Sequence, residues 1–88
     1  MYVHIGKDII INSNDIIAIL DIESLEKKKN LNEILQNLKI SDKIIDVSEE
    51  NKKSLVILKK NGKVLGYITN ISSITLGKRA ENNFDNLI

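Results

Sequence analysis

Side chains that could carry out catalysis are few and scattered in this chain of 88 residues. Acid–base catalysis needs two convergent carboxylates, one of them with a raised pKa. The acids here fall in expected loops and at expected strand ends, where turn or capping roles are typical; they are Asp8, Asp15, Asp21, Glu49 and Glu50. The single histidine, His4, cannot build a histidine-rich metal site, and Ser72-Ser73 has no recognisable base. We therefore predict that the protein is not an enzyme.

Cofactor and metal chemistry lack support for related reasons. The absence of cysteine excludes thiol nucleophiles, iron–sulfur clusters, zinc sites of the cysteine type and disulfide scaffolds. The glycines match neither common glycine-rich phosphate-binding pattern; they are Gly6, Gly62, Gly66 and Gly77. We expect no metal and no small-molecule cofactor.

The lysines favour a binding function instead. Residues 1–50 hold six basic side chains against ten acidic ones, and residues 51–88 hold seven against two, so the two parts carry −4 and +5 within a net charge of +1. Such asymmetry indicates a surface for nucleic acid or another polyanion, or contact between the basic side of one subunit and the acidic side of the next. A solvated lysine surface with no partner is the alternative.

Lys52 and Lys53 are the candidates for contacts with duplex phosphates, because they lie in a loop that leads into a strand and no acid occurs between Lys52 and Arg79. Base stacking is not expected, because the chain has only two tyrosines and one phenylalanine. Affinity for DNA grows with the number of phosphate contacts, so a chain of net charge +1 needs an oligomer that repeats the patch.

The strands that must position these lysines are predicted by short apolar runs. Asn61-Gly62 between the runs 54–59 and 63–69 is typical of a type I′ turn and predicts an antiparallel hairpin. Further strands are expected at residues 2–5, 8–12, 16–21 and 43–47, the first three as a small meander. The continuous apolar run 16–21 predicts a strand covered on both faces.

Two helices are expected. Asn30 has the position of an N-cap before apolar residues at helical spacing, which predicts a helix at 31–39. Ser72 or Ser73 can cap a last helix at 74–83, with Ile74 facing inward. Residues 21–30 and 48–53 read as polar loops, and the apolar side chains of residues 84–88 are expected to dock on the sheet or on a neighbouring subunit.

Taken together, these elements predict one α+β domain over residues 1–88, built on a small antiparallel sheet. A cytoplasmic location is expected, because the N-terminus lacks the pattern of a signal peptide and no apolar window reaches about 20 residues. A homo-oligomer is expected, because the nearly continuous apolar strands are more than one short helix pair can cover.

Four strings occur in an order that resembles the bacterial extracellular matrix regulatory protein family, most closely its B type: MYVHIGKDIII, DIIAILDIES, KSLVILKK and ISSITLGKRA. The resemblance covers the whole chain. It implies a small cytoplasmic protein of Gram-positive bacteria with a β-rich fold like that of the LytTR DNA-binding domain. Members of the A type bind DNA as ring-shaped oligomers and activate genes for biofilm matrix production.

The resemblance also implies positions for a DNA site. One functional arginine of the A type aligns with Asp15, beside Asn14, and a second aligns with Asn51, followed by Lys52 and Lys53. Lysines can replace the second arginine as point charges without its bidentate fork, which suits phosphates better than bases. We therefore expect a DNA-binding transcription regulator, with Asp15 favouring the alternative of a non-catalytic scaffold subunit that has lost DNA binding.

Overall fold

The computed structural model describes residues 1–28, 30–40 and 43–85, with side chains described up to residue 80. The elements follow in the order β1 (Tyr2–Gly6), β2 (Ile9–Asn12), the 3-10 turn η1 (Ser13–Asp15), β3 (Ile16–Asp21), α1 (Ile22–Glu26), α2 (Leu31–Asn37), β4 (Ile44–Asp46), β5 (Ser54–Lys60), β6 (Lys63–Thr69) and α3 (Ser73–Asp85). The predicted α+β class is confirmed. None of the described helices is long and apolar enough to cross a membrane.

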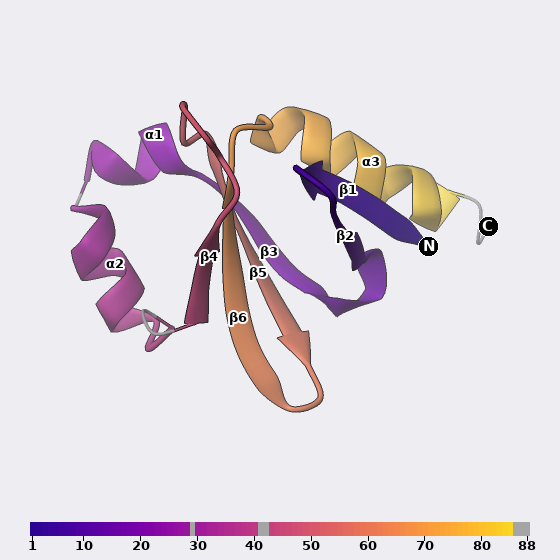
Figure 1. The fold of residues 1–88 in the computed structure, drawn as a ribbon, viewed down its shortest axis with the longest axis horizontal. Helices are drawn as coiled ribbons and strands as arrows, with labels where there is room; N and C mark the ends of the chain where they lie inside the picture. Colours follow the sequence, from indigo (N-terminus) through magenta and orange to yellow (C-terminus); the bar gives the residue numbers. More distant parts are fainter. Residues whose placement is uncertain (29, 41–42, 86–88) are drawn as a thin grey trace.

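The strands form a four-stranded sheet in the order β3-β5-β6-β4 and a separate two-stranded sheet of β1 and β2 (Figure 1). Each pairing is antiparallel except that of β4 with β6, which is parallel. The larger sheet is therefore mixed rather than purely antiparallel. The first three strands do not form the predicted meander, because β3 leaves β2 and pairs with β5.

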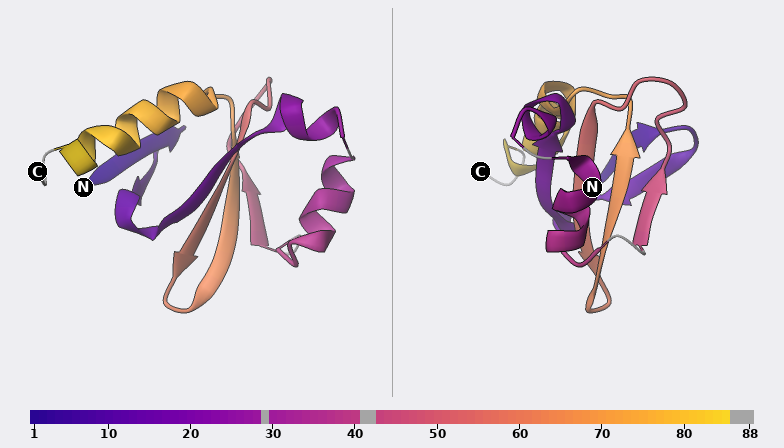
Figure 2. Two further views of the ribbon diagram at one scale, coloured as in Figure 1. Left: turned by 180° about the vertical axis from the view of Figure 1, so that it is seen from behind. Right: turned by 90° about the vertical axis from the view of Figure 1, so that its left-hand side faces the viewer.

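Strand β5 is the centre of the core, and its side chains alternate between two apolar clusters. Leu55 and Ile57 pack with residues of α1 and α2, whereas Val56 and Leu58 pack with residues of β1, β2 and α3. Figures 1 and 2 show the resulting layers, with α1 and α2 on one face of the larger sheet and β1, β2 and α3 on the other. Strand β5 is thus the best buried strand of the domain, and the residues at its two ends are attached to a well-packed element.

Local signals predicted several element boundaries correctly. Asn61 and Gly62 have φ angles of 53° and 78°, as a type I′ turn requires, and Lys60 pairs with Lys63 across the turn. The Asn30 side chain accepts a hydrogen bond from the Asn32 N–H, so the predicted cap of α2 is confirmed. Helix α3 begins after Ser72, whose hydroxyl oxygen accepts from the Thr75 N–H.

Other expectations were wrong. The strand covered on both faces is β5, whereas β3 lies at a sheet edge and leaves Ile17 56% exposed. Residues 22–26 form α1 rather than a loop, because the Asp21 carboxylate caps them by accepting from the Ser24 N–H. On α3 the inward side chain is Leu76, and Ile74 is 72% exposed. The predicted docking of side chains 84–88 lies outside the described side chains.

Candidate nucleic-acid interface

The backbone of Lys53 is held between two elements. Its N–H donates to the Thr69 carbonyl at 2.9 Å, and its carbonyl accepts from the Ile22 N–H at 2.9 Å. Thr69 is itself fully buried, and its hydroxyl donates to the carbonyl of Ile5 in β1. The exposed Lys53 side chain therefore projects from a fixed backbone just before β5 begins.

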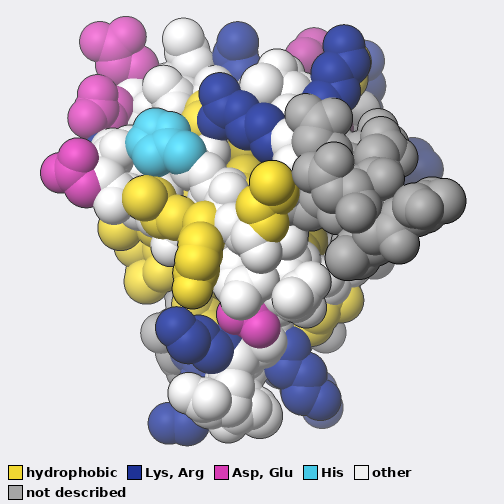
Figure 3. Space-filling model, turned by 90° about the vertical axis from the view of Figure 1, so that its right-hand side faces the viewer, with side chains coloured by type: hydrophobic (Ala, Val, Ile, Leu, Met, Phe, Trp, Pro, Cys, Tyr) yellow, Lys and Arg dark blue, Asp and Glu magenta, His cyan; other side chains and the backbone are white. Residues whose placement is uncertain are grey.

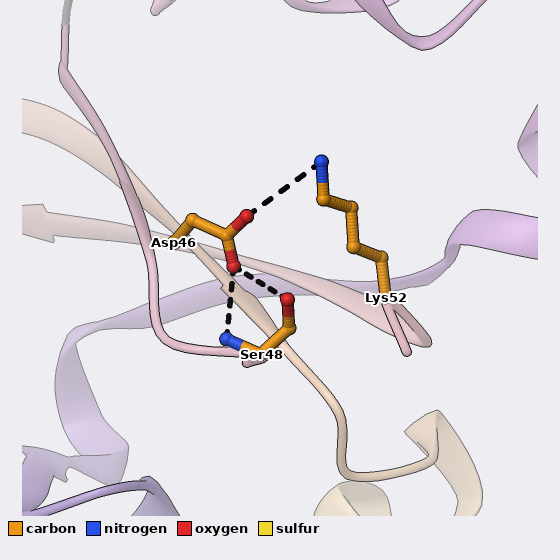
Figure 4. Close-up of polar contacts among 3 residues, drawn as sticks. All are labelled: Asp46, Ser48 and Lys52. Carbon is orange, nitrogen blue, oxygen red and sulfur yellow. Dashed lines mark hydrogen bonds and ion pairs between the residues drawn. The ribbon is translucent and has the colours of Figure 1, made fainter. Parts of the chain in front are cut away.

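Lys52 meets an acid that lies outside the lysine-rich stretch (Figure 4). Its Nζ is 3.6 Å from Asp46 Oδ2, with side-chain exposures of 52% and 42%. Asp46 Oδ1 also accepts from the Ser48 hydroxyl at 2.6 Å and from the Ser48 N–H at 2.8 Å. These bonds hold the pKa of Asp46 below its ordinary range. At neutral pH Lys52 therefore faces a carboxylate, which comes from before the acid-free stretch between Lys52 and Arg79.

The loop over residues 48–53 is less open than predicted. Ser48 is only 2% exposed, and the Glu50 N–H donates to the Ser48 carbonyl at 2.7 Å. A polar hollow of about 170 Å³ lies at this loop; it is lined by Ser48, Glu49, Glu50, Asn51, Lys53 and Asn70. Asn51 and Lys53 are thus brought together as predicted, but beside two glutamates.

Asn14 is not brought to the other candidates. It lies in η1, where its backbone N–H donates to the Asn12 side chain at 2.9 Å. This turn precedes Ile16, which pairs with Leu58, whereas Ser54 pairs with Asp21 at the other end of the strand pair. With roughly 3.3 Å per residue, Asn14 and Lys53 lie at opposite ends of β5. Within one protomer they cannot form a single site.

A second lysine group, not assigned to the site from the sequence, lies at the end of β5 near η1. Lys59, Lys60 and Lys63 are exposed at the β5–β6 turn. A groove of about 320 Å³ adjoins this turn; it is lined by Tyr2, Ile10, Ile11, Asn12, Asp15, Leu58, Lys60, Leu65 and Tyr67. Both tyrosines of the chain therefore line one groove, which no sequence pattern predicted.

Arg79 serves the fold rather than the lysine surface. Its guanidinium donates to the carbonyl of His4 at 2.8 Å, which ties α3 to β1. The His4 ring in turn contacts the carbonyl of Lys7 through Nε2 at 2.6 Å. Among the residues that the structure describes, no three histidine, aspartate or glutamate side chains gather closely enough to hold a metal ion.

Comparison with known proteins places this arrangement in a family. A family model described as "RemA-like: Extracellular matrix regulatory protein A-like" matches residues 2–80. The chain belongs to this family. It is also 31% identical over 87 residues to Extracellular matrix regulatory protein B of Bacillus subtilis (strain 168), covering 97% of this chain and 96% of that protein. The resemblance inferred from the four strings is thus confirmed. No solved structure matches the chain.

Proposed function

We propose that this member of the extracellular matrix regulatory family is a cytoplasmic transcription regulator of matrix genes that binds duplex DNA without catalysis. The matrix-regulatory part rests on family membership and on the relative's name. The observation that carries the DNA contact is the pair Lys52 and Lys53, two consecutive exposed residues of which Lys53 has both its backbone N–H and its carbonyl hydrogen-bonded. Such a pair suits phosphate contacts, which set position and affinity rather than sequence choice.

The ion pair with Asp46 does not block this role. Exposed ion pairs contribute about 0–1 kcal/mol to stability, so Lys52 can exchange the carboxylate for a phosphate at little cost. Asp46 then keeps its two hydrogen bonds from Ser48. Lys53 contributes a second exposed charge one residue further along the chain.

A homo-oligomer with a ring-like arrangement belongs to the proposal, because one protomer offers few phosphate contacts. Exposed apolar side chains on the protomer support self-association; they include Tyr2, Ile10, Ile17, Ile45 and Ile74. Light scattering at tens of micromolar should give a multiple of 9.9 kDa. A monomeric mass would contradict this part of the proposal.

The DNA contact is tested by binding isotherms at several salt concentrations on one matrix-gene promoter duplex and one random duplex. Lys52→Ala/Lys53→Ala should weaken binding about equally on both, and should flatten the salt slope by roughly 1–2 per subunit engaged. Lys39→Ala/Lys78→Ala removes the same charge from exposed positions after α2 and on α3. Equal losses for the two double variants would show an effect of net charge rather than contact.

The acids at the loop favour one second candidate, a scaffold subunit that assembles but does not bind DNA. Asp46 pairs with Lys52, and Glu49 and Glu50 line the hollow beside Lys53. The same isotherms separate the two functions, because an assembled wild-type protein without affinity for either duplex fits only the scaffold.

A further inference from the structure

The turn between β5 and β6 projects beyond the other elements (Figures 1 and 2). The two strands pair continuously from Ser54 with Thr69 to Lys60 with Lys63. The positive φ angles at Asn61 and Gly62 fix the turn in the form whose twist suits a hairpin. The lysines of this hairpin tip, defined as residues 59–63, are therefore carried on a two-stranded ribbon with a well-defined end.

Both faces of the ribbon carry lysine side chains at the hairpin tip. Lys60 and Lys63 are directly opposite each other, so they point to one face, and Lys59 points to the other. Like charges in opposite positions destabilise a strand pair. Among the described residues none of the three lysines forms an ion pair, whereas Lys52 does. Figure 3 shows dark blue side chains gathered at the narrow lower end of the molecule.

An acid nearby moderates but does not cancel this charge. Asp15 lines the same groove as Lys60 but forms no ion pair among the described residues. Lys43 is exposed just before β4, whose first residue, Ile44, pairs with Gly66 in the middle of β6. The end of the domain at the hairpin tip, the hairpin end, is thus more uniformly basic than the end at residues 48–53, the loop end.

We propose that the hairpin tip is a second contact surface for duplex DNA, separate from Lys52 and Lys53, and that it enters the major groove. This inference rests on the proposed function. The major groove of B-DNA is about 12 Å wide and admits a two-stranded β-ribbon, with phosphates along both walls. A ribbon with lysines on both faces meets phosphates on each wall.

The separation between the two lysine sites makes their effects distinguishable. Lys60 is seven positions after Lys53, which corresponds to roughly 23 Å along an extended strand. The two sites therefore contact different phosphates, and loss of one leaves the other in place.

The test compares the wild-type chain with Lys60→Ala/Lys63→Ala, with Lys39→Ala/Lys78→Ala as the control of equal charge, on a 24-base-pair DNA duplex. We expect the hairpin variant to bind roughly tenfold more weakly with a smaller salt slope, and the control to stay within about twofold. Asp15→Asn should shift affinity the other way, about two- to threefold tighter. Circular dichroism and melting temperature verify folding, and loss of repulsion should leave the hairpin variant at least as stable.

Each of the other outcomes contradicts a specific part of the proposal. Wild-type DNA binding with an unchanged hairpin variant, or with equal losses in the control, rejects the hairpin contact alone. No wild-type binding rejects both this contact and the proposed function. Tighter binding to an RNA duplex of the same sequence rejects the major-groove placement, because the major groove of A-form RNA is deep and narrow.

Discussion

Just before β5, Lys52 Nζ lies 3.6 Å from Asp46 Oδ2. Lys53 borders a hollow that Glu49 and Glu50 also line. At the end of β5, Lys59 and Lys60 are exposed at the hairpin tip, without an ion pair among the described residues. The sequence places both groups in one basic half. The fold separates them: Asp46, Glu49 and Glu50 lie beside Lys52 and Lys53, whereas the hairpin lysines have Asp15 in the groove beside Lys60.

The comparison shows that charge along a chain is a poor guide to charge in space. Asp46 lies only six residues before Lys52, so the short loop between β4 and β5 brings the two side chains together. At the hairpin tip the turn and the lysines are also adjacent in sequence, but Asp15 reaches the groove beside Lys60 through the long-range pairing of β3 with β5. Local chemistry therefore determines the environment at one end of β5, and topology determines it at the other.

The largest effect on stability is expected from a substitution in the buried core of β5, the strand that joins the two ends. Leu55 of β5 is fully buried in the apolar cluster with residues of α1 and α2. Leu55→Ala should therefore lower the free energy of unfolding by about 2–5 kcal/mol. Both ends should unfold together in one denaturant transition. Circular dichroism measures the transition, and two separate steps would mean that the ends are independent units.

The hairpin end can be disturbed by itself. Gly62 has a φ of 78° with open space around its Cα, so Gly62→Ala should cost about 1–2 kcal/mol through backbone strain alone. DNA contacts of Lys60 and Lys63 should weaken, while those of Lys52 and Lys53 should not.

Gly77 offers the matched control for that substitution. It lies within α3, also with open space around it and without a positive φ, so Gly77→Ala should stabilise the protein by about 0.5–1 kcal/mol. Thermal melts of the two alanine variants should shift in opposite directions. Shifts of the same sign would show that backbone conformation does not decide the effect.

What could be predicted from the sequence follows the same division. The Asn61-Gly62 turn and the caps Asn30 and Ser72 are local features, and each was found. Helix α1 was missed because its short sequence is mostly polar and only Ile22 is buried. Within the candidate site, the neighbourhood of Asn51 and Lys53 was predictable. The separation of Asn14 from them depends on strand register, which the sequence pattern does not reveal.

A smaller effect should sharpen the contrast at the loop end. Asp46→Asn keeps an oxygen that can accept from Ser48 but removes the charge that faces Lys52. Affinity for a DNA duplex should rise about two- to threefold at neutral pH, since Lys52 no longer exchanges one anion for another. Lys52→Ala in the same background should abolish the gain. An unchanged affinity in Asp46→Asn would remove Lys52 from the interface.

The smallest expected effect is a loss of folding stability at low pH. Hydrogen bonds from the Ser48 hydroxyl and N–H lower the pKa of Asp46 in the folded protein, and Ser24 does the same for the pKa of Asp21. A lowered folded-state pKa stabilises the fold at pH values above the ordinary aspartate pKa of about 3.9. That stabilisation is lost as pH falls from about 5 through the folded-state values.

This acid loss can be assigned to the loop end by comparing the wild-type protein with Asp46→Asn in denaturant titrations at several pH values. Because the Asp46 side chain is 42% exposed, solvent screening limits its share to less than about 1 kcal/mol. The wild-type protein should therefore lose slightly more stability between pH 5 and pH 2 than Asp46→Asn does. Lys60→Ala/Lys63→Ala should follow the wild-type pH curve, because neither Asp46 nor Asp21 forms an ion pair at that end of the domain. Parallel curves for wild type and Asp46→Asn would show that the hydrogen bonds of Ser48 do not depend on the carboxylate charge.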